Sequence, residues 1–295
     1  LHKAFDECDK SAHERGLRVT GSELVGLVPL KSMLDAGKYF LLKQERSIGI
    51  SEEEIIKIAV KSMGLDELTP FDTKKNIIEY MLAEDDVRPL VKMDLKAFAN
   101  ETASESPAPG GGSIAAYLGV LGVSLGTMVA NLSSHKRAWD ERWEEFSEWA
   151  TKGQAIKDKL LWLVDEDTAA FNKIMEAFQL PKGSEKEKIA RSQAIQDATK
   201  YAIEIPFSVM ETSYASFDLL KNMAAIGNPN SVSDAGVGAL CARSAVLGAY
   251  LNVKINVADL KDEAFKKDIL ARARKIAEDT QKAEAEILAI VESKL

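Results

Sequence analysis

The feature that most constrains the fold of this chain is a run without charged residues, Ile114–Ser134, which directly follows the loop Ser104–Ser113 (SESPAPGGGS). The run is long enough to cross a membrane as a helix, and its glycines have the spacing of close helix–helix contacts. It is rich in Ala, Gly, Ser and Thr and only mildly apolar, and no other segment resembles a span. We therefore expect a buried central helix, packed closely against other helices, and no membrane span.

The loop before this run contains two prolines and the glycines Gly110, Gly111 and Gly112. Without Cβ atoms, backbone N–H groups can approach a ligand or a neighbouring helix closely, and Ser113 is a natural N-cap for the helix that follows. Bare amides at a helix N-terminus can bind an anion or a carbonyl group. The loop by itself is equally consistent with a plain turn.

Length and composition bound the class of protein. A chain of 295 residues, 46% hydrophobic and 28% charged, suggests one large or two ordinary folded domains. The net charge of −8 argues against nucleic acid as the main partner. Two distant cysteines, Cys8 and Cys241, exclude a disulfide scaffold and a cysteine zinc site, and they fit a reducing compartment. We therefore expect a cytoplasmic protein.

Three histidines, His2, His13 and His135, are too few and too scattered for a histidine metal site, so no metal is expected. His135 precedes Lys136 and Arg137, and this cluster suits the C-terminus of a helix electrostatically. A surface cap and an acid–base group are both open readings of His135.

Residues 1–82 mix extended and helical patterns. Strands are predicted at 17–20 and 24–28, and helices at 3–15, 30–36, 52–63 and 74–82. One or two strands cannot make a stable sheet alone, so this part resembles the end of a larger α/β domain whose front is missing. The first residue, Leu1, is not Met, which is typical of a fragment or a processed product. The charged segment 83–93, with Pro89, is a predicted linker.

From Asp94 onward the strand signals nearly vanish. Helices are predicted at 94–104, 113–134, 138–179, 184–203, 206–226, 232–257 and 262–293. Long helical runs with short breaks predict an up-and-down bundle over 94–295, and a mainly α fold class for the chain. Pro206 should free the carbonyl oxygen of Ala202 and kink or restart the helix, with Glu211 as a buried partner beyond it.

The sharpest candidate functional residue is Asp167. It interrupts an apolar stripe with alternating spacings of four and three residues, formed by Leu160, Val164, Phe171, Ile174 and Phe178. Burial there should raise the pKa of Asp167 unless a partner charge offsets it, and such a group can hold or move a proton near neutral pH. Asp165 and Glu166 fall off the stripe and are expected either to be solvated or to support neighbouring residues from behind. A structural ion pair, or a cap on another helix, is the alternative role for Asp167.

A second set of polar residues interrupts the apolar run 231–256. Asn252 and Asn256 are four residues apart and share a helix face. Asp234, Arg243 and Lys254 also interrupt the run. Arg243 is suited to pair with a buried acid or to bind a ligand carboxylate through two hydrogen bonds, and both readings stay open.

Several motifs in one order resemble the formiminotetrahydrofolate cyclodeaminase family. They are Ser104–Ser113, Leu163–Phe171, Gly227–Gly236 and Ala249–Asn256, with Asp259–Phe265 similar to the family's closing segment. Arg18–Pro29 resembles the end of the C-terminal subdomain of glutamate formiminotransferase. The whole chain is therefore similar to the later part of bifunctional formiminotransferase-cyclodeaminases.

The resemblance implies an all-helical domain that forms a homodimer or a larger homo-oligomer and binds a folate, with or without added glutamates, near the subunit interface. The family converts 5-formiminotetrahydrofolate to 5,10-methenyltetrahydrofolate and ammonia in histidine degradation. The resemblance implies no metal or redox cofactor, because the tetrahydrofolate is the substrate itself. The catalytic transferase region lies upstream of Leu1 in that family, so formimino transfer is not expected from this chain alone.

The family's catalytic aspartate corresponds to Asp167. It would take the proton of folate N10, as N10 attacks the formimino carbon, and deliver it to the departing nitrogen. The candidate substrate-binding residues are Pro109, Gly110, Gly111, Gly112, Ser113, Asn228, Ser231, Asp234, Arg243, Asn252 and Asn256. For the glutamate tail of the folate, Lys136, Arg137 and Arg243 are candidates.

Two other functions remain open on the sequence. The same helical domain occurs in bacterial methenyltetrahydrofolate cyclohydrolases, which hydrolyse the methenyl compound; the transferase-like N-terminal part favours the cyclodeaminase. In a non-catalytic oligomerisation module, Asp167 would be a structural acid. Release of ammonia from formiminotetrahydrofolate separates these readings.

Overall fold

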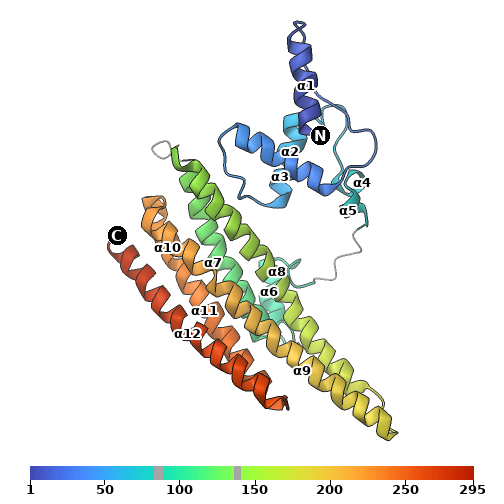
Figure 1. Cartoon of the computed structure of the whole chain (residues 1–295), viewed down its shortest axis with the longest axis vertical. Helices are drawn as coiled ribbons and strands as arrows, with labels where there is room; N and C mark the ends of the chain where they lie inside the picture. The colour runs from blue at the N-terminus through green and yellow to red at the C-terminus, as the bar shows by residue number, and fades with distance from the viewer. Residues whose placement is uncertain (83–88, 136–140) are drawn as a thin grey trace. The chain divides into compact units, whose positions relative to one another are not determined.

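The computed structural model describes residues 1–82, 89–135 and 141–295 of the chain and is mainly helical, as predicted (Figure 1). Two compact units are present: residues 1–87 with 131–151, and residues 88–130 with 152–295. Part of the predicted linker, 83–88, lies outside the described residues, as do Lys136 and Arg137.

The first unit is built on two packed helices, α2 (Leu30–Lys43) and α3 (Glu52–Met63). It also contains α1 (His2–His13), α4 (Thr73–Asn76) and α5 (Ile78–Leu82). The start of α3 is capped by the Ser51 hydroxyl, which accepts from the Glu54 N–H, and Gly64 ends the helix with φ +59°.

The strands predicted at 17–20 and 24–28 do not form in the described part of the chain. This segment is extended, but its only ladder contact there is a parallel bridge between Val28 and Ile77. An extended segment becomes a strand only beside a second one, and here most of the segment stays in solvent, with Val25 91% exposed, while Val28 at its end is buried.

The second unit is a helical bundle. Its helices are α6 (Leu95–Thr102), α7 (Gly111–Ser134), α8 (Trp143–Gln179), α9 (Glu185–Tyr214), α10 (Ser216–Ile226), α11 (Val232–Asn256) and α12 (Glu263–Glu292), with short turns η2 (Pro229–Ser231) and η3 (Val257–Asp259). The ends of α7 and α8 nearest 131–151 belong to the first unit. Figure 1 shows α9, α11 and α12 side by side, and α11 packs against both of the others.

Small residues bring α7 and α11 together. A Cβ on Gly122 would lie 2.8 Å from the Gly238 carbonyl oxygen, so this approach requires glycine.

Two helices of the described chain, Gly111–Ser134 and the segment Pro229–Asp259, are long and apolar enough to span a membrane. The expectation that no segment besides Ile114–Ser134 resembles a span was therefore wrong. Both helices pack inside the bundle, and α7 is the more buried of the two.

Pro206 does not break the chain into two helices. It lies buried inside α9, and the interruption falls later, at Ala215, which separates α9 from α10. The proline does leave the Ala202 carbonyl without its helical donor, as predicted, and the Asn256 side-chain amide donates to that oxygen at 2.7 Å. This replacement bond, with the close packing of Pro206, accounts for the uninterrupted helix. Glu211 is exposed and pairs with Arg272, so its predicted burial was wrong.

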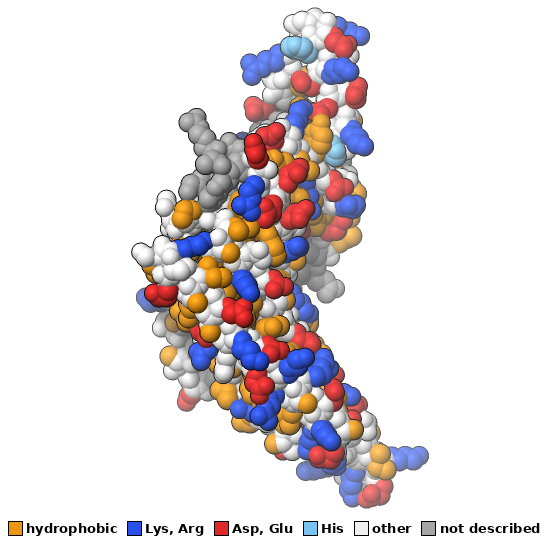
Figure 2. Space-filling view, turned by 60° about the vertical axis from the view of Figure 1, so that its left-hand side comes forward, with side chains coloured by type: hydrophobic (Ala, Val, Ile, Leu, Met, Phe, Trp, Pro, Cys, Tyr) orange, Lys and Arg blue, Asp and Glu red, His pale blue; other side chains and the backbone are white. Residues whose placement is uncertain are grey.

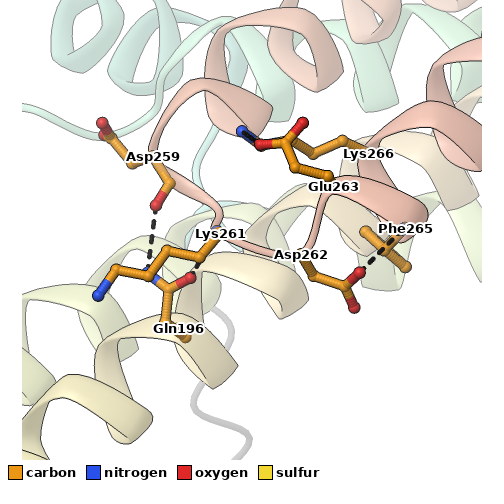
Figure 3. Close-up of polar contacts among 7 residues, drawn as sticks. All are labelled: Gln196, Asp259, Lys261, Asp262, Glu263, Phe265 and Lys266. Atoms are coloured by element: carbon orange, nitrogen blue, oxygen red, sulfur yellow. Dashed lines mark hydrogen bonds and ion pairs between the residues drawn. The ribbon is translucent and has the colours of Figure 1, made fainter.

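The connection between α11 and α12 is fixed to α9 by one side chain. The Gln196 amide donates to the Asp259 carbonyl at 3.2 Å and accepts from the Lys261 N–H at 2.7 Å (Figure 3). Asp262 then caps α12 by accepting from the Phe265 N–H (Figure 3). The C-terminal end of α11 is thereby fixed against α9. On the face visible in Figure 2, acidic and basic side chains are interspersed.

Candidate functional site

The glycine-rich loop meets a carboxylate that comes from another helix. The α7 helix begins at Gly111, so Ser113 is not its N-cap as predicted but its third residue. The Ser113 N–H donates to Asp167 Oδ2 at 2.9 Å, and the Ser113 hydroxyl lies 3.2 Å from the same oxygen. Asp167 of α8 therefore occupies the capping position of α7, where free N–H groups and the helix dipole favour an anion.

Gly112 is what allows this contact. A Cβ at that position would lie 2.1 Å from Asp167 Oδ1, which no side chain tolerates. The neighbouring Gly111 differs, because its Cβ would meet only the Asn252 amide at an ordinary 3.5 Å. Of the three glycines, Gly112 is thus the one required by the approach of Asp167.

A cavity of about 170 Å³ opens at this junction. Its wall comes from the loop, from α8 and from the facing parts of α9 and α11. The lining residues are Pro107, Ala108, Gly110, Gly111, Gly112, Asp167, Thr168, Phe171, Ile174, Ala202, Asn252 and Asn256. The volume is below that of a complete drug-sized ligand site, so the cavity holds only part of a larger molecule.

Asp167 is largely enclosed, yet it retains access to the cavity. Burial raises the pKa of Asp167 above its ordinary value, and the two hydrogen bonds from Ser113 oppose that rise in part. The apolar stripe around it divides at this point. Leu160 and Val164 are buried in the core, whereas Phe171 and Ile174 beyond Asp167 line the cavity.

Asp165 is more buried than Asp167, so of its two expected positions, solvated or supporting, the solvated one is wrong. It accepts the N–H of Leu90 at 2.9 Å and that of Val91 at 3.2 Å. A carboxylate can lie off the apolar stripe and still be buried when backbone N–H groups of a neighbouring segment cover it. Its role in the structure is to hold the segment before α6.

Two asparagines of α11 form the opposite wall. Both Asn252 and Asn256 line the cavity, as their shared face predicted. Asn252 donates its amide to the Gly248 carbonyl at 3.0 Å, and Asn256 donates to Ala202 as described. Their side-chain amide nitrogens are therefore engaged by backbone oxygens.

The other predicted site residues lie away from this wall. Pro109 is buried beside the cavity but does not line it. Asn228, Ser231 and Asp234 lie at the opposite end of α11, and Asp234 is about 27 Å along the helix axis from Asn252 at 1.5 Å per residue. Arg243 pairs with Glu284 of α12 at 3.0 Å and does not line the cavity.

Sequence reasoning missed several cavity residues. Phe171 and Ile174 were assigned to the stripe, although their spacing from Asp167 places them on the same face. Thr168 was not singled out, and its Oγ1 is buried without a hydrogen-bond partner in the described structure. Ala202 was predictable in part, because Pro206 marks its carbonyl as free.

Two further expectations concern metals and His135. No group of three or more His, Cys, Asp or Glu side chains within the described ranges is placed to share a metal ion. His135 lies at the end of α7, where burial and the nearby Arg46 lower its pKa, and it is not part of the cavity wall.

The sequence of this chain is similar to two protein-family models and to several curated proteins. Residues 94–275 match the family model described as "Formiminotransferase-cyclodeaminase", and residues 1–83 match the "Formiminotransferase domain". Over its full length the chain is 35% identical to the formimidoyltransferase-cyclodeaminase of Mus musculus and 37% to that of Gallus gallus, covering 54% of each. The chain thus spans about half the length of these curated relatives.

Two shorter proteins match the bundle. A methenyltetrahydrofolate cyclohydrolase of Methylorubrum extorquens is 33% identical over 201 residues, 68% of this chain and 97% of that protein. The crystal structure of a formiminotetrahydrofolate cyclodeaminase from Thermotoga maritima superposes with a TM-score of 0.61 at 26% identity, covering 68% of this chain and 97% of that one.

Proposed function

The chain belongs to the formiminotransferase-cyclodeaminase family, and on that premise we propose that it closes 5-formiminotetrahydrofolate to 5,10-methenyltetrahydrofolate with release of ammonia. The observation that carries the proposal is the position of Asp167. Its carboxylate has a raised pKa, contacts the glycine-rich loop and opens into a cavity. This is the environment that a group needs to accept and return a proton near neutral pH.

The reaction requires one proton to move between two nitrogens of the substrate. The N10 lone pair forms a bond to the carbon of the protonated formimino group, whose C=N double bond becomes a single bond to NH2. The Asp167 carboxylate takes the proton from N10 and then gives it to that NH2. The C–N bond breaks, ammonia leaves with the electron pair, and the methenyl cation forms between N5 and N10. Asp167 ends as a carboxylate, ready for the next cycle.

Binding and chemistry are assigned to different parts of the cavity. The Gly110–Gly112 backbone and the asparagines of α11 would hold the pterin, while Phe171 and Ile174 provide apolar surface. The 170 Å³ volume leaves the aminobenzoate and glutamate portions outside the cavity. Arg243 stays a candidate for a tail carboxylate, although that role would compete with Glu284.

A second copy of the chain is the partner we propose for the bundle. The α11 helix presents an apolar stripe to solvent, in which Leu251 is 62% and Ile255 70% exposed, with Val237 and Leu240 further along. A stripe of this kind on a soluble enzyme is typical of an interface between copies. Asp234 lies about 27 Å along the helix from Asn252, and Asn228 and Ser231 lie farther still, so we propose that these three residues reach the folate-binding cavity of a second copy.

The remaining parts of the proposal follow the substrate. Tetrahydrofolate supplies the reacting nitrogens, so we propose no separate cofactor. The free cysteines Cys8 and Cys241 suit a cytoplasmic location. Formimino transfer is not proposed for these residues alone.

The test follows methenyltetrahydrofolate by its long-wavelength absorbance, starting from 5-formiminotetrahydrofolate, with ammonia measured in parallel. Equal rates for both products support the proposal, and Asp167→Asn is the first variant to compare. A folded sample that forms neither product would favour the non-catalytic oligomerisation module.

The second candidate is hydrolysis of methenyltetrahydrofolate, which the cyclohydrolase relative of Methylorubrum extorquens supports. There a water molecule would lose its proton to Asp167 as it attacks the methenyl carbon. The match of residues 1–83 to a formiminotransferase domain favours the cyclodeaminase. Loss of methenyl absorbance without any ammonia from the formimino substrate would reverse that preference.

A further inference from the structure

The two asparagines of the cavity wall use their side-chain amides in the same way: within the described structure, the nitrogen is bonded to the protein and the oxygen is not. Each donates its side-chain N–H to a backbone carbonyl, Asn252 to Gly248 at 3.0 Å and Asn256 to Ala202 at 2.7 Å. Neither side-chain oxygen has a protein donor among the described residues. Neither oxygen is among the fully buried polar atoms without a partner in those residues, so both oxygens are accessible. An amide that has committed its nitrogen can offer a ligand only its oxygen.

The orientation of Asn256 depends on a residue of another helix. In an ordinary helix the Ala202 carbonyl would accept from the N–H of residue 206, but Pro206 has none. That carbonyl is buried with Ala202 in α9, so it needs another donor, and the Asn256 amide supplies it. A reversed Asn256 would point its oxygen at the Ala202 oxygen, which is repulsive. Pro206 thus selects one of the two amide orientations.

We propose that Asn252 and Asn256 form a pair of acceptors that recognises the donor edge of the pterin, with Pro206 as the positioning residue for Asn256. The two side chains are one helical turn apart, about 6 Å, on the same face of α11. The aminopyrimidine of a tetrahydropterin carries two neighbouring donors on one edge, the 2-amino group and N3–H. This assignment rests on the proposed function, because it takes the folate as the ligand.

The same arrangement explains how the wall is held in place. Gln196 of α9 joins both sides of the α11–α12 connection, through Asp259 and Lys261 (Figure 3). Two sets of hydrogen bonds therefore attach the end of α11 to α9, one through Gln196 and one between Asn256 and Ala202. Of these residues, Asn256 and Ala202 line the cavity and Gln196 does not. A rigid support of this kind is what a hydrogen-bonding subsite needs to discriminate between ligands.

The experiment measures dissociation constants of two probes by calorimetry. One probe is 5-formyltetrahydrofolate, and the other is its analogue with the 2-amino group replaced by hydrogen. The parent protein should prefer the first probe by about tenfold, the value of a hydrogen bond that one partner leaves unmade. Asn256→Ala should lose most of this preference, while Pro206→Ala, which frees Asn256 to turn, should lose part of it.

A double variant separates binding from folding. In Pro206→Ala/Asn256→Ala the restored N–H of residue 206 can satisfy the Ala202 carbonyl, so the melting temperature should return toward the parent value. The preference for the 2-amino probe should stay lost. Asn222→Ala is the control for loss of an asparagine amide bond away from the cavity, because Asn222 donates to the Asp218 carbonyl within α10.

The outcomes are distinct. Equal weakening of both probes in Asn256→Ala, or a double variant that recovers the preference, would show that Asn256 is only structural and would overturn the inference. An unchanged preference in Pro206→Ala would remove the positioning role. Failure of the parent protein to bind 5-formyltetrahydrofolate at all would overturn the proposed function as well.

Discussion

Two places in the bundle look alike in sequence, and among the described residues only one of them receives a carboxylate from another helix. Both α7 and α11 follow a loop with glycine, proline and serine, and both are rich in small residues. At the start of α7, Asp167 of α8 accepts from Ser113 beside Gly112. Before the start of α11, the short turn η2 is capped by its own residue, since the Asn228 side chain accepts from the Asn230 N–H at 3.1 Å.

The difference teaches that a glycine-rich loop before a helix does not make a site. Gly227 is also crowded, but by the Met223 carbonyl of the preceding helix, so its glycine serves a tight turn. Gly112 is crowded by a titratable side chain with a raised pKa. Chemistry is therefore expected at the α7 end, and at most binding at the α11 end.

The largest expected effect tests the carboxylate itself. Asp167→Asn keeps the shape and can still accept from Ser113, but it cannot take a proton from N10. We expect kcat to fall by about 10²- to 10⁴-fold, the usual contribution of a positioned acid–base group, with folate binding near normal. Steady-state rates and a dissociation constant for 5-formyltetrahydrofolate check this. A fully active Asn variant would mean that Asp167 has only a structural capping role, as Asn228 has before α11.

The next effect tests the glycine that admits the carboxylate. Gly112→Ala puts a methyl group 2.1 Å from Asp167 Oδ1, so the carboxylate must move by an ångström or so. A misplacement of this size costs about 10²-fold in rate, and the expected loss is in kcat. Gly111→Ala is the matched control, because its Cβ makes only ordinary contacts. Similar rates for the two variants would contradict the special role of Gly112.

A smaller effect distinguishes a buried carboxylate from a plain helix cap. The folded-state pKa of Asp167 is raised above 3.8, so the folded protein holds this proton to higher pH than the unfolded chain and loses stability as pH rises through the folded pKa. Asp167→Asn does not titrate. Its melting temperature relative to the parent should therefore increase as the pH rises from the ordinary Asp pKa of 3.8 through the raised folded-state pKa.

The sign of this trend is the test. A plain cap has a lowered pKa, and its removal would instead cost more stability at higher pH. Calorimetry at a series of pH values measures the melting temperature of both proteins and gives the sign directly. Asp158→Asn, which removes an exposed carboxylate from the same helix, is the control and should show no comparable trend.

Helix content and Asp167 were predictable because both depend on local pattern. The apolar period and the capping residues predicted most helices to within a few residues, and the interruption of the stripe marked Asp167. Other features depend on contacts between distant segments. The burial of Asp165 comes from the Leu90 and Val91 N–H groups, and the continuity of α9 through Pro206 depends on Asn256.

The predicted strands at 17–28 also show that local sequence does not reveal contacts between distant segments. The pattern of residues 17–28 favours extended backbone, and the backbone is extended, but a strand also requires a pairing partner. Gly112 was singled out only as one of three glycines, since nothing local tells which of them faces a carboxylate more than fifty residues away. Sequence thus marked Asp167 as an acid with a raised pKa but did not show which residues it meets.

The smallest expected effect concerns the start of α11. If Asp234 contacts the folate of a second copy, it does so by binding, so Asp234→Asn should raise KM by about threefold or less and leave kcat unchanged, as a lost rim contact does. Steady-state kinetics give both values, with the melting temperature as a check on the helix start. A tenfold fall in kcat would mean that both helix starts take part in the chemistry. The two starts would then differ only in how much each contributes to kcat.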